Sequence, residues 1–142
     1  EITTRLVGSE MCIRDRLWTV NTAVDIGNLV SIDYGYSVGC FDYDKIQGND
    51  IVLGVGRAGE PYEGIGRGVL NIEGMPVYRD SAGGIGTPTS DNERTKMSLA
   101  TTRMLAVVNG YDGNENKMDE CLRFLVAAYE KYLGAVCETV KF

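Results

Sequence analysis

Glycine is concentrated in the middle of this sequence, and its concentration there excludes a long helix. Of the 142 residues 18 are glycine, and many of them fall within residues 54–74. Only proline is a poorer helix former than glycine, so this segment must consist of turns and extended chain. Residues 69–72 and 75–80 have the composition of strands, and residues 81–84, with the sequence SAGG, predict a turn after the second. The middle of the chain is therefore expected to be rich in β-structure.

Two segments have the periodicity of an amphipathic helix. Asp25 can cap a short helix that ends at Gly35. The apolar residues of this first helix follow the i, i+3, i+4 spacing of one face; they are Ile26, Leu29 and Val30. A second helix is expected from about residue 114 to residue 133, with Gly134 as its end. Its apolar stripe is expected to pack in the core; the stripe comprises Met118, Cys121, Leu122, Leu125, Ala128, Tyr129 and Tyr132.

Three further segments predict strands. Residues 38–46 alternate in polarity, and the turn residues 47–50 separate them from the apolar residues 51–53, which predicts two strands joined by a hairpin-like turn. The run 104–108 is short and continuously apolar, as in a central strand buried on both faces. With the helices, these strands indicate an α+β fold in a single domain.

Composition excludes several classes of function. The net charge is −6, from 14 basic and 20 acidic side chains, which disfavours strong binding to a phosphate backbone, so DNA is not expected as a partner. Histidine is absent, which excludes Ser-His and Cys-His catalysis and removes the most common zinc ligand. No apolar run approaches the roughly 20 residues of a membrane span, so we expect a soluble, cytoplasmic protein. The cysteines form no CxxC pair and are expected to be reduced; they are Cys12, Cys40, Cys121 and Cys137.

Three patterns in the sequence suggest a cofactor or a metal, but none of them is well supported. Residues 54–59, GVGRAG, match the GxGxxG dinucleotide motif, but Pro61 and the following glycines prevent the helix that the motif requires. The sequence GIGRG at residues 64–68 fails for the same reason. Asp42 and Asp44 would share one face of a strand, but two carboxylates are weak evidence for a metal, and a solvated face is the simpler interpretation. No cofactor or metal is therefore expected.

The segment of residues 83–96, GGIGTPTSDNERTK, is predicted to be a glycine-rich loop that leads into a polar cluster, and it is the candidate binding site. Glycine lets a backbone approach a ligand closely, and hydroxyl and charged groups follow it directly. We expect either Asp91 to bind an ammonium group or Arg94 to bind a carboxylate or phosphate, unless the two side chains pair with each other. The other expected contacts are the backbone near Gly84 and Gly86 and the hydroxyls of Thr87, Thr89 and Thr95. Ser90 and Glu93 also have the spacing of a helix capping box, so the same polarity is compatible with a purely structural role.

Residues 1–16, EITTRLVGSEMCIRDR, show neither helical nor strand periodicity. Part of the segment, SEMCIRDR, has the form of translated sequencing-adapter read-through. We therefore interpret residues 1–16 as a non-native segment and residues 17–142 as a partial, N-terminally truncated domain.

Four sequence segments, in this order, resemble the B3/B4 domain of the phenylalanyl-tRNA synthetase beta chain and its free-standing relatives. The segments are VDIGNLVSIDYG, VGCFDYDKIQGNDIVL, PTSDNERTK and MLAVV. The resemblance covers about residues 17–142 and implies an α+β fold of β/β/α layers with a C-terminal amphipathic helix.

The resemblance also implies a function, because in the synthetase this domain edits by hydrolysing tyrosine wrongly esterified to the phenylalanine tRNA. Asn28 matches a pocket asparagine, and Phe41 belongs to the FD pair of the family. Gly39, however, stands where bacterial synthetases have a pocket histidine, and Val108 where they have the glutamate that recognises the tyrosine hydroxyl. Tyrosine specificity is therefore not carried over by the resemblance.

We accordingly expect a homologue of an aminoacyl-tRNA editing domain, which binds the 3′ end of an aminoacyl-tRNA and acts as a deacylase in trans. It would not be a complete tRNA ligase. Because the chain is acidic, we expect a partner protein to deliver the RNA. The alternative is a non-catalytic module that binds a free amino acid or a similar small metabolite.

Overall fold

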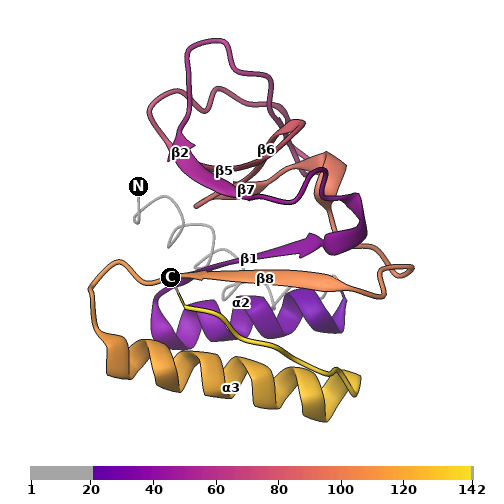
Figure 1. Ribbon diagram of the computed structural model, residues 1–142, viewed down its shortest axis with the longest axis vertical. Helices are drawn as coiled ribbons and strands as arrows, with labels where there is room; N and C mark the ends of the chain where they lie inside the picture. Colours follow the sequence, from indigo (N-terminus) through magenta and orange to yellow (C-terminus); the bar gives the residue numbers. More distant parts are fainter. Residues whose placement is uncertain (1–20, 142) are drawn as a thin grey trace. The chain divides into compact units, whose positions relative to one another are not determined.

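The computed structural model describes residues 21–141, which fold into two compact units (Figure 1). One unit combines residues 21–38 with residues 108–141, and the other is Gly39–Val107. Helices and several strands are both present, so the fold is α+β, as the sequence predicts. Neither of the described helices is long and apolar enough to cross a membrane. The interpretation of residues 1–16 concerns a segment outside the described residues.

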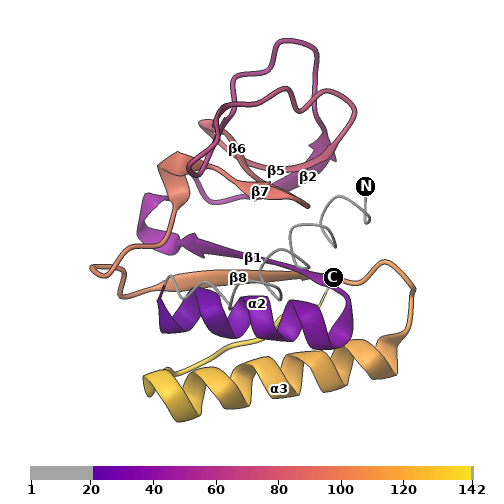
Figure 2. The same ribbon diagram turned by 180° about the vertical axis from the view of Figure 1, so that it is seen from behind.

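The first unit contains two helices, α2 (Thr22–Tyr34) and α3 (Glu115–Leu133), which lie side by side in both views (Figures 1 and 2). Helix α2 begins earlier than expected, because the side chain of Asn21, rather than Asp25, accepts a hydrogen bond from the Val24 amide at 3.0 Å. Asp25 lies in the first turn, where a carboxylate also favours the helix dipole. Both helices end as predicted, at glycines in the left-handed conformation, Gly35 and Gly134.

The packing of α3 confirms most of the predicted apolar stripe. Cys121, Leu125 and Tyr129 are buried, one helical turn apart from each other, and the Tyr129 hydroxyl donates to the Ala23 carbonyl at 3.3 Å. Tyr132 lies at the end of the stripe and is 63% exposed, so it takes no part in the core. On α2 the buried apolar residues are Ile26 and Val30, whereas Leu29 is exposed.

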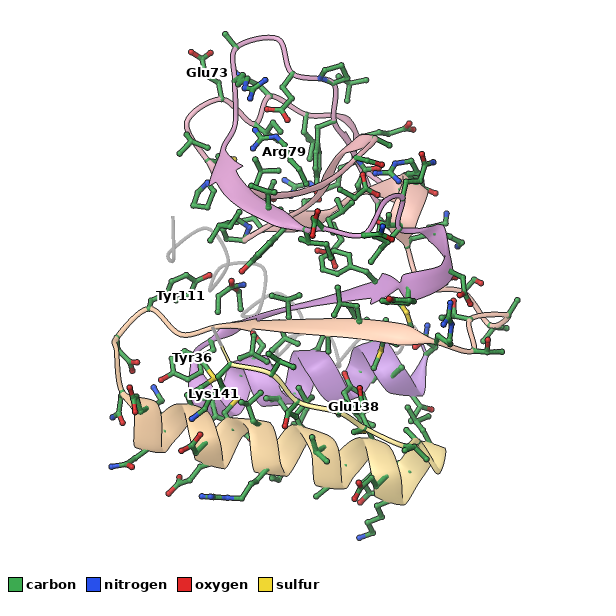
Figure 3. The ribbon with its side chains drawn as sticks, in the orientation of Figure 1. Tyr36, Glu73, Arg79, Tyr111, Glu138 and Lys141 are labelled. Atoms are coloured by element: carbon green, nitrogen blue, oxygen red, sulfur yellow. The ribbon has the colours of Figure 1, made fainter. Side chains whose placement is uncertain are left out.

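Hydrogen bonds between side chains fix the loop that leads into α3, and two of the tyrosines involved, Tyr36 and Tyr111, are labelled in Figure 3. The buried Tyr36 donates its hydroxyl to the Asp112 carboxylate at 2.7 Å, and burial, with that carboxylate, raises the pKa of Tyr36 to about 12. The Tyr111 hydroxyl is hydrogen-bonded to the Ser37 hydroxyl. The ammonium of Lys117 lies over the Tyr36 ring, 4.5 Å from its centroid.

Strands β1 (Ser37–Asp42) and β8 (Met104–Asn109) form a two-stranded sheet. Strand β1 ends four residues before the predicted end at residue 46, because Asp42 caps the short 3-10 helix η1 (Tyr43–Lys45) by accepting from the Asp44 amide at 3.1 Å. Asp42 and Asp44 therefore do not share a strand face. The prediction that β8 is a central strand buried on both faces is also wrong, because all its residues are partly exposed and β1 is its one partner among the described strands.

The second unit contains a four-stranded antiparallel sheet with the order β2-β5-β6-β7. Its strands are β2 (Val52–Val55), β5 (Pro76–Asp80), β6 (Gly83–Thr87) and β7 (Ser90–Asp91). A separate hairpin joins β3 (Glu63–Gly64) to β4 (Gly68–Val69). The predicted strands over residues 51–53 and 75–80 are thus present, but the predicted hairpin between β1 and β2 is not, because each pairs with a strand distant in sequence. A compact apolar cluster in this unit comprises Tyr62, Ile72, Val77 and Leu70.

The glycine-rich sequence GGIGT is strand β6 rather than a loop. The predicted turn is shorter than expected, because Gly83 already pairs with Asp80 of β5. Ile85, between two glycines of β6, is fully buried. The first half of the candidate binding segment is therefore a rigid strand with neighbours on both sides.

The carboxylate of Asp80 ties the turn between β5 and β6 to two other segments. One carboxylate oxygen accepts from the amides of Ala82 and Gly83, at 2.9 and 3.1 Å, and the other accepts from the Gln47 amide at 2.8 Å. The Arg94 guanidinium binds both oxygens, at 2.8 and 2.9 Å. Burial opposes ionisation, but these donors together hold the pKa of Asp80 below its usual range.

Replacing Asp80 by alanine is expected to destabilise the protein by about 3–5 kcal/mol, because it leaves a guanidinium and several amides without their acceptor. Chemical denaturation monitored by circular dichroism measures the change. Asp44→Ala is the matched control, because it breaks a carboxylate–arginine pair, with Arg103, whose members are both exposed; its effect should be far smaller.

The same variant tests the pH dependence. Because the folded-state pKa of Asp80 is lowered, its stabilisation is complete above the unfolded-state value of about 4 and is lost as the pH falls through the folded-state value. The difference in unfolding free energy between wild type and Asp80→Ala should therefore shrink below about pH 4. A difference that stays constant into strong acid would contradict the assignment.

Candidate functional site

The ring of Phe41 lies against two glycines that the sequence placed in the candidate site. Phe41 is fully buried at the end of β1. A Cβ atom built on Gly39 would lie 2.8 Å from the ring carbon Cζ, and one built on Gly86 would lie 2.6 Å from it. Real Cβ contacts are longer than this. The two glycines are therefore required by the aromatic ring, which occupies the space that a side chain at either position would need.

The carboxylate of Asp91 lies beside this ring. Asp91 is in β7, where it pairs with Gly86 of β6, and it is partly buried. Its Oδ1 lies 3.3 Å from the Cβ position of Gly86 and 3.5 Å from that of Gly39. The structure thus brings together four predicted site residues, which are Gly39, Phe41, Gly86 and Asp91. A carboxylate held next to an aromatic ring in a partly buried place suits an ammonium group.

A second aromatic ring explains the glycine at position 84. A Cβ atom on Gly84 would lie 2.8 Å from the ring of Tyr62, which is buried. The Tyr62 hydroxyl donates to the Ser90 carbonyl at 2.6 Å. Burial, together with the nearby charge of Asp91, raises the pKa of Tyr62 well above its usual range. Sequence reasoning missed Tyr62, and the available signal was the presence of glycines on a strand where aromatic side chains must pack.

The threonines of the segment differ in their surroundings. The Thr87 hydroxyl donates to the Ser90 carbonyl at 2.9 Å and accepts from the Ser90 amide at 3.1 Å, which closes the β6–β7 hairpin. Thr89 lies in the turn of that hairpin and is partly buried. Thr95 is fully buried, and its hydroxyl lies 3.5 Å from the Ile85 carbonyl. Within the described part of the chain Thr87 and Thr95 have internal hydrogen-bond partners, so Thr89 is the best placed of the three threonines to meet a ligand.

The predicted capping box at Ser90 and Glu93 is wrong. The short helix η2 (Glu93–Thr95) is capped instead by Asn92, whose side chain accepts from the Arg94 amide at 2.9 Å. Ser90 cannot cap it, because Ser90 belongs to β7. The Arg94 side chain, predicted to bind a carboxylate or phosphate, is held by Asp80 and remains 31% exposed.

The remaining predicted site residue, Asn28, belongs to the other unit. It is exposed on α2, away from the buried face of that helix. Its contribution to a pocket stays a prediction. Val108 belongs to the same unit as Asn28, in β8, and is partly buried.

The acidic pair Asp42 and Asp44 has internal partners. Asp42 is buried, accepts a hydrogen bond from the Thr101 hydroxyl at 2.7 Å and lies 3.4 Å from the Lys45 ammonium. The hydrogen bond from Thr101 has the largest effect on the pKa of Asp42 and, with the Lys45 charge, holds it below its usual range. Asp44 is paired with Arg103. Among residues 21–141 no three acidic or cysteine side chains gather in a way that could hold a metal ion.

Comparison with known protein families shows to which family the chain belongs. The sequence profile of the B3/4 domain matches residues 9–120. The chain belongs to the B3/4 domain family. No curated protein sequence gives a significant match.

A solved structure shares the fold of this B3/4 domain. It is an N-terminal fragment of the phenylalanyl-tRNA synthetase beta-subunit from Pyrococcus horikoshii, with a TM-score of 0.66 and 17% sequence identity. The superposition covers 77% of the present chain and 39% of the synthetase fragment. The chain thus spans well under half the length of that fragment, and the likeness concerns the fold alone.

The packing of Phe41 gives a direct test. Gly86→Ala should lower the unfolding free energy by about 1–3 kcal/mol, because the new methyl group overlaps a buried ring that cannot move away. Gly110→Ala is the control. Its methyl group would approach only the flexible Met118 methyl, also at 2.6 Å, so denaturant titration should show a smaller loss. Equal losses would contradict the requirement for glycine under Phe41.

Proposed function

We propose that this B3/4 domain binds the amino-acid part of an aminoacyl-tRNA and promotes hydrolysis of the ester in trans. Membership of the family and the fold shared with a phenylalanyl-tRNA synthetase beta-subunit fragment support a synthetase-related domain. The step to ester hydrolysis rests on the editing role that the resemblance implies.

One observation indicates which residues would bind the amino acid. The Asp91 carboxylate is partly buried next to the Phe41 ring, on a hairpin that Tyr62 and Thr87 hold in place. The ammonium of an amino acid would be attracted to this carboxylate, and partial burial strengthens the attraction relative to that in water. Thr89, at the turn of the same hairpin, can offer a hydroxyl to the ligand.

The proposed chemistry requires no covalent nucleophile. Positioning of a water molecule beside a polarised ester is sufficient for hydrolysis, and binding energy from the amino acid and the RNA can supply the positioning. The absence of histidine in the chain is compatible with this mechanism. With glycine at position 39 and valine at position 108, the amino acid removed is expected to differ from tyrosine.

The alternative is an amino-acid-binding module without catalysis, and one observation favours it. The Phe41 ring occupies the space above Gly39, the position that matches the pocket histidine of bacterial synthetases. No polar side chain from that position can polarise an ester. The same carboxylate would then hold a free amino acid.

The deciding experiment measures the deacylation of a panel of mischarged tRNAs by the full chain. Asp91→Asn should lower the rate on the preferred substrate by about tenfold or more, because it removes the charge that binds the ammonium while preserving side-chain shape. Asp50→Asn is the matched control, since Asp50 is an exposed carboxylate in the same unit; it should leave the rate unchanged.

The outcomes separate the two functions. If no mischarged tRNA is hydrolysed faster than in buffer, the enzymatic proposal fails. Thermal stabilisation by a free amino acid, lost in Asp91→Asn but kept in Asp50→Asn, would then establish the binding module. If the folded protein shows neither hydrolysis nor stabilisation, both functions are excluded.

A further inference from the structure

Almost all the cationic side chains of the Gly39–Val107 unit are used in internal ion pairs. Five of its seven lysines and arginines pair with carboxylates of the same unit. The pairs are Lys45–Asp42, Arg79–Glu60, Arg94–Asp80, Lys96–Glu93 and Arg103–Asp44. A cation that already faces a carboxylate attracts a phosphate less strongly, because the neighbouring negative charge offsets its own. The offset is largest for the more buried Arg79–Glu60 and Arg94–Asp80 pairs and smallest for the exposed Arg103–Asp44 pair.

The two exceptions are Arg57 and Arg67. Both side chains are exposed, and neither forms an ion pair within the described chain. They lie at the two ends of a glycine-rich segment, residues 56–68, that contains β3 and the turn leading to β4. In a unit whose other cations are occupied, these arginines are the groups available to an external anion.

The segment that carries Arg57 is held firmly. The Arg57 amide donates to the Glu60 carboxylate at 2.9 Å, and that carboxylate is clamped by Arg79, one of the residues labelled in Figure 3. The Gly56 amide donates to the Met75 carbonyl at 2.7 Å. An alanine methyl at Gly56 would lie 1.8 Å from the Ile72 carbonyl oxygen, so only glycine fits there. Arg57 is therefore presented from a fixed backbone.

The turn that carries Arg67 is attached to the candidate site. The Arg67 amide donates to the Gly64 carbonyl at 3.0 Å, and the Ile65 amide donates to the carbonyl of Asp91 at 3.1 Å. A further bridge joins Gly64 to Asn92. Arg67 is thus two residues from a direct backbone contact with the residue proposed to bind the ammonium group.

We propose that Arg57 and Arg67 bind backbone phosphates of the single-stranded end of an RNA whose terminal aminoacyl group lies at Asp91. The inference rests on the proposed function and identifies which surface of the unit meets the RNA. Arginine suits this role because its planar guanidinium binds phosphate oxygens in pairs. Because only these two cations of the unit are without an ion pair in the described chain, few phosphates are contacted. Much of the binding energy must then come from the aminoacyl group at Asp91.

The test is a salt titration of RNA binding. A fluorescently labelled, unacylated single-stranded RNA matching the acceptor end of tRNA is titrated with the full chain at several salt concentrations, and anisotropy gives the affinity. In the double variant Arg57→Gln, Arg67→Gln, affinity at low salt should fall. The slope of log affinity against log salt should become shallower by about 1.4, or about 0.7 for each lost phosphate contact to a single strand.

The matched control is the double variant Arg123→Gln, Lys131→Gln in α3. It removes the same charge, and both side chains are exposed without an ion pair in the described structure. It should leave the slope unchanged. Equal slopes for the two double variants would show a general charge effect and overturn the proposal. The absence of any RNA binding by the wild type would overturn it as well.

The result of the RNA titration can be distinguished from a failure of the proposed function. Hydrolysis and amino-acid stabilisation depend on Asp91, whereas the titration uses an RNA without an amino acid. If the arginine variant loses neither RNA affinity nor slope while Asp91→Asn still abolishes amino-acid stabilisation, the phosphate contacts are refuted and the amino-acid site stands. Loss of stabilisation by amino acids in the arginine variant would show damage to the site and would also contradict separate roles.

Discussion

The buried carboxylate of Asp80 organises the unit that carries the candidate site. Through five hydrogen bonds it joins the segment before β2, the turn between β5 and β6, and the short helix after β7. Asp80 thereby connects the start of β6 and the helix that follows β7 to the segment before β2. The hydrogen bonds of Thr87 and Tyr62 to Ser90 hold the β6–β7 hairpin itself, which places Asp91 beside Phe41.

The sequence predicts the elements whose signals are local. Asn114, Gly134 and the apolar stripe between them lie within about twenty residues, and α3 agrees closely with its prediction. The pairing of strands depends on contacts between distant residues, which local patterns do not contain. Strand β1 therefore pairs with β8 rather than with the neighbouring β2. The alternating polarity of residues 38–46 also gave no sign that the strand ends at Asp42, whose side chain caps a helical turn.

The predicted site residues differ in how well the sequence indicated their surroundings. Gly39, Phe41, Gly86 and Asp91 do gather in one place. The charged and hydroxyl side chains of residues 87–95 look equally available in sequence, but Arg94 is held by Asp80 and Thr87 by Ser90. Which polar groups have internal partners depends on segments that the chain brings together only in folding. Arg57 and Arg67 lie in the two glycine motifs that were rejected as nucleotide sites, and folding brings no carboxylate into an ion pair with either of them within the described chain.

The packing of one aromatic ring against two glycines couples the side-chain volumes at three positions. A larger residue at Gly39 or Gly86 is excluded while Phe41 is present, and a smaller residue at Phe41 leaves a cavity that either position can fill. Exchange of volume between these positions changes the space next to the Asp91 carboxylate without altering the strands. Paired substitutions in this core can therefore reshape the candidate site while its charged groups stay in place.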